Sequence, residues 1–187
     1  MREIILENFT EHCEVLEKSK DNLIDKIEQA ATLVTNTIEQ GGKLMICGNG
    51  GSAADSQHIA AEVVGRFKKE RRGLPAIALT TDSSILTAIG NDYGFDKIYS
   101  RQIEAIAVSR DLLIAISTSG NSKNMIEGVK AARKIGCTVV GLSGMSGGIL
   151  NSICNLTINV PSNNTARIQE VHILISHIIC ELLENNY

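Results

Sequence analysis

Four polar side chains with catalytic potential lie at helical spacings in two apolar segments. His58 and Glu62 are four residues apart in QHIAAE, and Gln169 and His177 are eight apart in RIQEVHILISH. At 100° per residue, the first pair spans about 40° of a helix surface and the second about 80°. Glutamate and histidine can move protons on a substrate, and two histidines, a carboxylate and an amide oxygen are plausible zinc ligands. Taken alone, each residue could equally be solvated or structural, and His172 is best explained as a structural histidine.

Two loops rich in glycine and serine are the second chemical feature. GNGGS, residues 48–52, and STSGNS, residues 117–122, each follow an apolar, strand-like segment. Ligands of open parallel sheets bind beyond the carboxyl ends of the strands, where helix N-termini attract anions. Gly120 lets the backbone approach a ligand closely, and several hydroxyls together could hold a phosphate without a lysine. The hydroxyls are those of Ser117, Thr118, Ser119 and Ser122. Helix capping, the alternative, accounts for one hydroxyl and not four.

The loop sequences disfavour two other uses of a phosphate site. Neither loop contains the GKS or GKT of a P-loop, and no magnesium-binding acid pattern accompanies them, so we expect a phosphate monoester to be held and not transferred. Gly48, Gly50 and Ala53 partly match the dinucleotide fingerprint GxGxxG/A. The acid expected about twenty residues later is missing, because the first candidate, Asp82, comes too late. A nicotinamide-dependent dehydrogenase is therefore disfavoured.

The segments between these motifs predict an α/β fold. Strand-like apolar segments alternate with helix-like segments, which is typical of a doubly wound, five-stranded parallel sheet covered on both faces. The strand-like segments are 43–48, 74–80, 111–117, 137–143 and 155–160, and the helix-like segments are 52–67, a short one from residue 83, 96–107, 121–136 and 165–184. No repeat or linker divides the chain, so we predict a single domain over residues 1–187.

The first forty residues predict additional helical structure. Apolar residues recur at three- and four-residue steps from Ile5 to Ile38, and Gly41 and Gly42 end the pattern. We interpret residues 1–40 as an N-terminal helical hairpin. Because a five-stranded sheet does not need this hairpin as cover, we predict that it forms a subunit interface in an oligomer.

Composition restricts the class of partner. Of the 187 residues, 43% are hydrophobic and 3% aromatic, which predicts a sizeable core of aliphatic side chains. A net charge of -3 gives no long-range attraction to nucleic acid, so we expect no nucleic-acid partner. No apolar run reaches the roughly eighteen residues that are needed to span a bilayer. The N-terminal segment does not have the pattern of a signal peptide. The five cysteines form no CxxC pair, and we interpret them as reduced core residues of a cytoplasmic protein.

The motifs GNGGSAADSQHIAAE, GNDYGF, STSGNS and RIQEVHILISH, in this order and spacing, closely resemble the phosphoheptose isomerases of the sugar-isomerase (SIS) domain superfamily. STSGNS alone would indicate only an SIS domain, whereas Glu62 and His177 narrow the resemblance to the isomerases. The resemblance implies a flavodoxin-like SIS domain that isomerises an aldose and a ketose through an enediol. Sedoheptulose 7-phosphate would become D-glycero-D-manno-heptose 7-phosphate, the first step toward ADP- or GDP-heptose for lipopolysaccharide core or capsule.

The same resemblance implies a role for each functional residue. Glu62 would be the base and His177 the acid, and one zinc ion per subunit would be bound by His58, Glu62, Gln169 and His177. Family members form homotetramers whose sites draw residues from neighbouring subunits. The substrate-binding residues implied are Asn49, Gly50, Gly51, Ser52, Glu62, Asn91, Asp92, Ser117, Thr118, Ser119, Ser122 and Gln169.

Two alternative functions stay open at this point. A non-catalytic SIS relative would bind phosphosugars or associate with proteins, as do the replication-initiator-associating proteins, whose ARIQE-like segment is similar to residues 166–170. Those relatives lack the acid–base pair, so the presence of both Glu62 and His177 favours an enzyme. The other alternative is an isomerase of a different phosphosugar. The residues that contact the hydroxyls along a sugar chain have no characteristic spacing in the sequence, so the sequence does not distinguish one phosphosugar from another.

Overall fold

Short apolar segments form the strands of a wholly parallel sheet. The computed structural model describes residues 1–187 and has five strands in the order β2-β1-β3-β4-β5. This is the flavodoxin-like order, so the predicted fold class is confirmed. The strands are β1 (Leu44–Gly48), β2 (Ala76–Ala78), β3 (Leu112–Ser117), β4 (Thr138–Ser143) and β5 (Leu156–Asn159).

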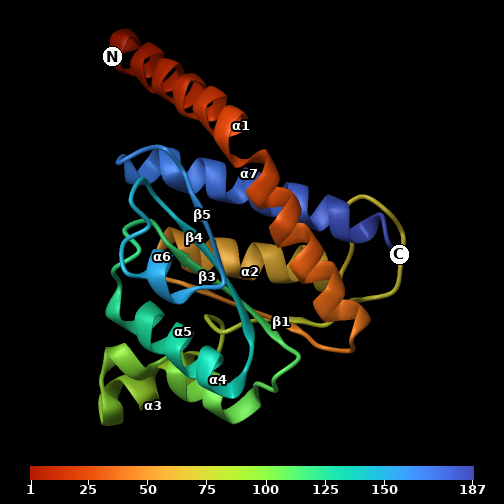
Figure 1. The fold of residues 1–187 in the computed structure, drawn as a ribbon. Helices are drawn as coiled ribbons and strands as arrows, with labels where there is room; N and C mark the ends of the chain where they lie inside the picture. Colours follow the sequence, from red (N-terminus) through yellow and green to blue (C-terminus); the bar gives the residue numbers. More distant parts are fainter.

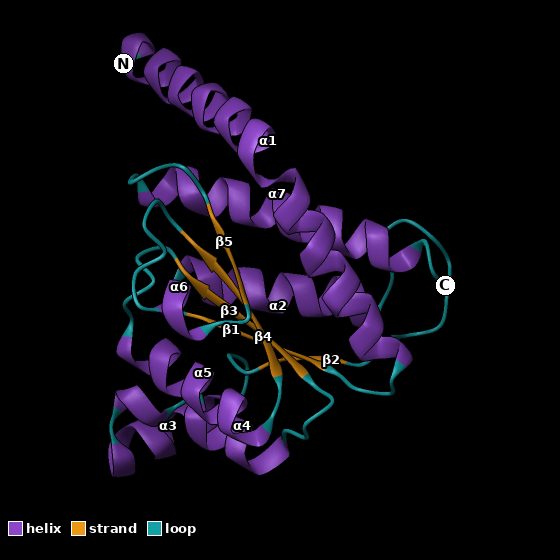
Figure 2. Cartoon of the chain, in the orientation of Figure 1, coloured by secondary structure: helices purple, strands orange, loops and turns teal.

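Helices cover both faces of this sheet (Figures 1 and 2). The helices α1, α2 and α7 lie on one face, and α4, α5 and α6 lie on the other, with α3 beside them. Their bounds are α1 (Arg2–Glu39), α2 (Gly51–Val64), α3 (Ser83–Tyr93), the 3-10 helix η1 (Phe95–Lys97), α4 (Ser100–Ile106), α5 (Lys123–Ile135), α6 (Leu150–Ile153) and α7 (Thr165–Glu184).

Alternation of side chains along the strands produces two cores. Leu44 and Ile46 of β1 belong to a cluster of 26 buried residues shared with α1, α2 and α7. Met45 and Cys47 belong to a second cluster of 16 buried residues shared with α4 and α5. Both faces of β1 and β3 are therefore buried, which explains why these strands are continuous apolar runs in the sequence.

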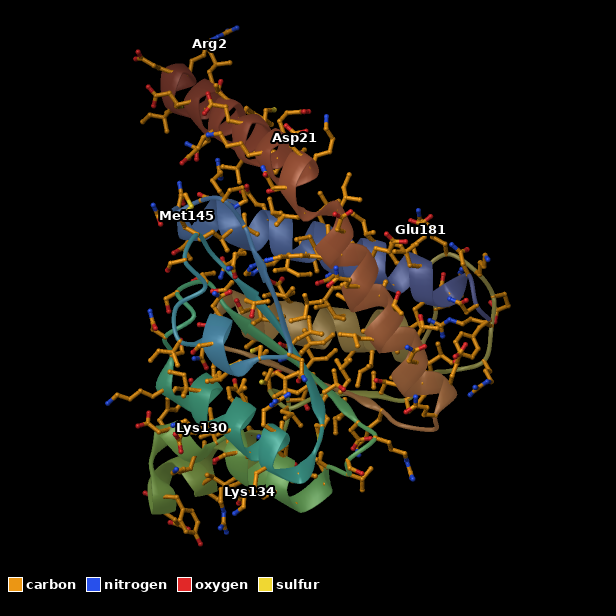
Figure 3. The ribbon with its side chains drawn as sticks, viewed as in Figure 1. Arg2, Asp21, Lys130, Lys134, Met145 and Glu181 are labelled. Carbon is orange, nitrogen blue, oxygen red and sulfur yellow. The ribbon has the colours of Figure 1, made fainter.

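The N-terminal segment is a single helix, so the predicted helical hairpin over residues 1–40 is wrong. α1 is continuous for 38 residues. No glycine or proline occurs between Arg2 and Glu39, and the helical spacing of apolar residues is unbroken, so nothing in this stretch favours a turn. The first ten residues are exposed, and Figure 3 shows the part of α1 between Arg2 and Asp21 projecting beyond the α/β body.

His172 has the structural role predicted for it. Its side chain on α7 is 0% exposed, and Nε2 donates a hydrogen bond to the carbonyl oxygen of Ser143, 3.1 Å away, while Nδ1 has no partner. Burial lowers the pKa of His172 to about 4, and the hydrogen bond to Ser143 acts in the opposite direction. The imidazole is therefore neutral in the folded protein near neutral pH.

This burial predicts an acid-sensitive fold. Between pH 6.5 and about 4 the unfolded chain binds a proton at His172 that the folded chain does not, so stability falls as the pH is lowered through this range. From pH 7 to pH 5 we expect a loss of about 2 kcal/mol in the free energy of unfolding. Urea unfolding at both pH values should show this loss for the wild type and for His12→Gln, and a smaller loss for His172→Gln. An unchanged loss in His172→Gln would contradict the assignment.

The cysteines are all free thiols. Cys47, Cys137 and Cys180 are buried as predicted and Cys154 is partly buried, whereas Cys13 is exposed on α1.

Among the helices, none combines the length and apolar character needed to cross a membrane.

Candidate active site

Three of the four polar helix residues meet between α2 and α7. The two helices pack against each other (Figure 1). His58 and Glu62 of α2 face His177 of α7. His58 Nε2 lies 3.1 Å from Glu62 Oε1 and 3.5 Å from His177 Nε2. One possible ligand atom from each residue lies within 4.8 Å of the others. The sequence spacing placed His58 and Glu62 on one face, and the packing of the helices adds His177.

The separations within this cluster fit a tetrahedral metal site. Ligand atoms about 2.05 Å from a tetrahedral zinc ion lie about 3.3 Å from one another. The distances from His58 Nε2 to Glu62 Oε1, 3.1 Å, and to His177 Nε2, 3.5 Å, bracket that value. Two imidazoles and a carboxylate are also donors that zinc accepts. His58, Glu62 and His177 could therefore hold zinc with little movement.

Gln169 does not join the cluster within one subunit. It precedes His177 by eight residues on α7, which is about 12 Å along the helix axis. Its amide lies instead beside the GNGGS loop, where a Cβ added to Gly51 would be 2.8 Å from Gln169 Nε2. The angular argument from the sequence was sound but took no account of axial distance. One chain therefore supplies three of the four predicted ligands at one place.

Two neighbours of the cluster were missed in the sequence. Asp55 is partly buried one turn before His58, and burial raises the pKa of its carboxyl group while His58 and His177 act in the opposite direction. Phe67 stacks on His177, with ring centroids 5.2 Å apart and ring planes 17° apart. The three-residue spacing from Asp55 to His58 could have revealed the first. Phe67 lies in a loop after α2, where spacing carries no signal.

The STSGNS loop makes a tight turn at the carboxyl end of β3. Gly120 has φ +65°, and a Cβ there would lie 1.9 Å from the carbonyl oxygen of Gly147, so only glycine fits. Ser117 Oγ and Ser122 Oγ are 3.2 Å apart. Ser122 precedes α5 at the N-cap position, but its side chain makes no capping hydrogen bond. Capping therefore does not explain this hydroxyl, whose hydrogen-bond partner is Ser117 Oγ and which could also bind a ligand.

The remaining hydroxyls of this loop differ in access. Ser119 is exposed, and its Oγ accepts a hydrogen bond from the Asn121 N–H at 3.2 Å. Thr118 is partly buried, and Ser117 is buried at the end of β3. A phosphate group could approach from the exposed side of the turn and meet the α5 N-terminus.

A pair of amides joins the GNGGS loop to the first turn of α5, which follows the STSGNS loop. Asn49 Nδ2 donates to Asn124 Oδ1 at 2.9 Å, and Asn124 Nδ2 donates to Asn49 Oδ1 at 2.8 Å. Tyr99 also donates from its hydroxyl to the carbonyl oxygen of Gly48 at 2.5 Å. Gly50 and Gly51 are exposed, whereas Ser52 is buried. The two loops therefore lie along one edge of the sheet, the loop edge, where an anion could bind and to which Asn49 belongs.

Within one subunit, this loop edge is separate from the cluster of His58, Glu62 and His177, called here the acid–base cluster after the roles expected of Glu62 and His177. α2 begins at the loop edge and runs back along the sheet, so Glu62 lies eleven residues, or about 16 Å, from Gly51 along the helix. Asn91 and Asp92 lie at a third place, the exposed end of α3, where Asn91 Nδ2 donates to Asp92 Oδ1 at 2.8 Å. Neither makes a hydrogen bond to the other predicted site residues. No residue of α3 is buried.

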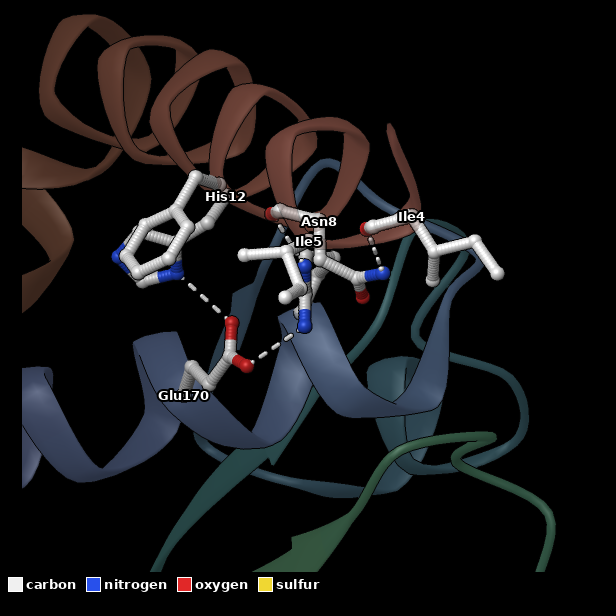
Figure 4. A pocket seen from close by; sticks show the side chains of 7 residues that line it. Ile4, Ile5, Asn8, His12 and Glu170 are labelled. Atoms are coloured by element: carbon white, nitrogen blue, oxygen red, sulfur yellow. Dashed lines mark hydrogen bonds and ion pairs between the residues drawn. The ribbon is translucent and has the colours of Figure 1, made fainter. Parts of the chain in front are cut away.

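A hollow of about 460 Å³ lies between the start of α1 and the start of α7 (Figure 4). At its floor His12 Nδ1 is 2.7 Å from Glu170 Oε2, and Arg167 donates to Glu170 Oε1 at 2.8 Å. Its residues are Ile4, Ile5, Asn8, Phe9, His12, Arg167 and Glu170. This hollow contains none of the predicted site residues.

Comparison with known proteins identifies the family. Residues 8–144 match the family described as SIS domain. The chain is 52% identical to the phosphoheptose isomerase of Aliarcobacter butzleri (strain RM4018) over 185 residues, which covers 99% of this chain and 98% of the relative. It is 58% identical to the phosphoheptose isomerase of Campylobacter concisus (strain 13826) over 166 residues, 89% of this chain and 88% of the relative. The structure of phosphoheptose isomerase from Neisseria gonorrhoeae superposes with a TM-score of 0.94 at 44% identity, covering 98% of each chain.

The fold and the two loops define an SIS domain, and the matches extend over nearly the whole chain. The chain belongs to the phosphoheptose isomerase family within the SIS domain proteins. The predicted family is thus confirmed, and the matches favour an isomerase over a non-catalytic SIS relative.

Proposed function

We propose that this isomerase interconverts sedoheptulose 7-phosphate and D-glycero-D-manno-heptose 7-phosphate, with Glu62 as the base and His177 as the acid. The observation that carries these roles is the meeting of a carboxylate and an imidazole, with possible ligand atoms within 4.8 Å, on two packed helices. A direct test is to incubate the purified protein with sedoheptulose 7-phosphate and measure formation of the aldose. Turnover of other ketose phosphates with none of this one would overturn the proposed substrate.

The reaction needs proton transfers and no other reactant. Glu62 removes a proton from C1 of the ketose while His177 protonates the carbonyl oxygen at C2, which produces an enediol. Glu62 then returns the proton to C2, and His177 takes the proton from the oxygen at C1, which leaves the aldose. The two sugars have the same atoms, and both side chains end in their starting protonation states.

We further propose zinc as the cofactor. His58, Glu62 and His177 would hold it in one subunit, since their donor atoms and separations fit. Zinc supplies Lewis-acid polarisation of the substrate oxygens when it is bound. Gln169 is the proposed fourth ligand, and its distance from His177 means that it would have to come from another subunit.

The proposed assembly is a homotetramer with sites shared between subunits. Two observations support sharing: the loop edge and the acid–base cluster are separated within one chain, and α3, which carries Asn91 and Asp92, has no buried residue. The exposed apolar side chains of α1 are a suitable interface, at Ile4, Ile5, Leu6 and Phe9. Light scattering should give four times the mass of one chain. A fully active monomer would contradict the proposal.

We place the protein in the cytoplasm and its product in heptose synthesis for lipopolysaccharide core or capsule. Five free cysteines, three of them buried, support a reducing compartment. The class of small-molecule partner is a phosphosugar, as the family implies.

The loop edge is proposed to hold the phosphate through Ser117, Thr118, Ser119 and Ser122, and the sugar through Asn49, Gly50, Gly51, Ser52 and Gln169. Asn91 and Asp92 of α3 are proposed as further sugar contacts. The seryl hydroxyl at residue 122 is the most informative of these, because it makes no capping hydrogen bond. A hydrogen bond to a charged group contributes about 1.5–3 kcal/mol.

Ser122→Ala should therefore raise KM at least about tenfold and change kcat little, because the phosphate is held and not transferred. Steady-state kinetics with the phosphosugar measure this effect. Ser152→Ala, at an exposed position of α6, is the matched control and should leave both constants unchanged. If Ser122→Ala lowers the melting temperature and leaves KM at the wild-type value, its role is structural.

A further inference from the structure

A buried ion pair joins the two helices that carry the acid–base cluster. Arg71 lies in the loop after α2, and Glu184 is the last residue of α7. Arg71 Nη2 lies 3.3 Å from Glu184 Oε1, and the two side chains are 2% and 1% exposed. Figure 2 shows this loop beside the C-terminal end of α7. His177 lies about two turns before Glu184, and Glu62 lies near the end of α2, so the pair is next to both helix segments.

Arg71 holds the end of α2 through the peptide group of the proposed base itself. Its guanidinium donates to the carbonyl oxygens of Glu62 and Val63, both at 2.9 Å, and of Gly65 at 3.1 Å. The last carbonyls of a helix have no partner within the helix, and a planar guanidinium can satisfy several of them in a fixed geometry. Arg71 therefore fixes the backbone from which the Glu62 side chain projects.

Glu184 binds the loop after α2 through the backbone of that loop. It accepts hydrogen bonds from the backbone N–H groups of Phe67, Lys68 and Lys69 at 2.6, 2.8 and 3.0 Å. Burial would raise the pKa of Glu184, but these hydrogen bonds and the charge of Arg71 together lower it, so the carboxylate stays ionised. The bound loop places the Phe67 ring against His177, with centroids 5.2 Å apart.

We propose that Arg71 and Glu184 form a positioning unit that sets the separation of Glu62 from His177. The unit acts on Glu62 through its carbonyl group and on His177 through the Phe67 ring. This inference rests on the proposed roles of Glu62 and His177. A pair that served only to stabilise the fold would not need to contact the peptide of one functional residue and fix the ring that packs on the other.

Glu184→Gln and Arg71→Lys test the unit. In Glu184→Gln, an amide N–H₂ group replaces one of the oxygens that accept from backbone N–H groups, so donors face donors. In Arg71→Lys, the positive charge is kept, but the planar guanidinium that donates to several carbonyls is lost. For each variant we expect kcat to fall about 10- to 100-fold, because an error of about 1 Å in catalytic geometry has effects of this size. KM should stay within about threefold of wild type, because the loop edge lies at the other end of α2.

Asp111→Asn is the matched control for stability. Asp111 is also a buried carboxylate, 2% exposed, that accepts from the N–H groups of Lys43 at 3.0 Å and Val108 at 2.8 Å and pairs with the Lys43 ammonium. It shares no partner with Arg71 or Glu184. We expect Asp111→Asn to lower the melting temperature as Glu184→Gln does, but to leave kcat within about twofold of wild type when assayed well below that temperature.

Histidine NMR gives a measurement that does not depend on turnover. With four histidines in the chain, the ring protons of His177 can be assigned by substitution, and they should carry a ring-current shift from Phe67. The shift should disappear in Phe67→Leu, shrink in Glu184→Gln and stay unchanged in Asp111→Asn. Phe67→Leu leaves the ion pair intact, so it tests the path to His177 even if Glu184→Gln does not fold, and should lower kcat with KM retained.

Two results would overturn the positioning unit. One is Glu184→Gln with wild-type kcat and an unchanged His177 resonance, in a background where Glu62→Gln is inactive. The other is a loss of kcat in Asp111→Asn equal to that in Glu184→Gln, which would assign the effect to stability alone. If Glu62→Gln is itself active, the proposed base is wrong, and that outcome is separate from a failure of the unit.

Discussion

Glu62→Gln is expected to lower turnover by about 10²–10⁴-fold, the contribution of a positioned general base. Glutamine has nearly the shape of glutamate and keeps an oxygen near His58 Nε2, which is 3.1 Å from the Glu62 carboxylate. It cannot accept a proton from the sugar carbon. Only 22% of the Glu62 side chain is exposed, but its one ion-pair partner, His58, has a side chain that is 47% exposed, so the fold does not depend on the Glu62 charge. Kinetics should therefore show a fall in kcat.

The controls separate loss of the base from loss of structure. Glu104→Gln changes an exposed carboxylate on α4 in the other helical layer and should leave kcat unchanged. The Glu62→Gln protein should keep the wild-type melting temperature in the absence of metal and should still bind the phosphosugar by calorimetry. Turnover near the wild-type value would exclude Glu62 as the base.

Removal of metal is expected to have the second largest effect. A chelator should lower activity at least about tenfold. His58, Glu62 and His177 are arranged at separations that suit zinc, and its removal would take away the positive charge that polarises the substrate oxygens. Addition of zinc should restore activity. Elemental analysis should find about one zinc per chain before chelation. The Nε2 environments of His58 and His177 should change on chelation in histidine NMR spectra, while that of buried His172 should not.

His58→Ala is the variant that isolates the metal role, because His58 has no proposed part in proton transfer. We expect it to bind less zinc, by 10- to 100-fold or more in affinity, and to require added zinc for turnover. His12→Gln, at the α1–α7 contact, is the matched histidine control. A purified protein that contains no metal and retains full activity in chelator would contradict the zinc proposal.

The core of the fold was readable from the sequence because its signals are local. Apolar runs such as those at Leu44 and Leu112 become buried parallel strands, and the segment from Thr165 to Glu184 forms a helix with the predicted bounds. The hairpin was wrong because an extended helix and a hairpin have the same apolar periodicity. Only the absence of glycine and proline between Arg2 and Glu39 distinguishes them.

The site divides in the same way. The sequence by itself determined the chemical groups, namely the hydroxyls around Gly120 and the Glu62 carboxylate one turn from His58, because each group is set by neighbours in the chain. The tertiary structure alone decided that His177 meets His58 and Glu62, while Gln169 stays about 12 Å away along α7. Arg71 and Glu184 show the reason most clearly. They are 113 positions apart in the chain, and a contact that depends on how two helices end beside each other leaves no periodic trace in the sequence.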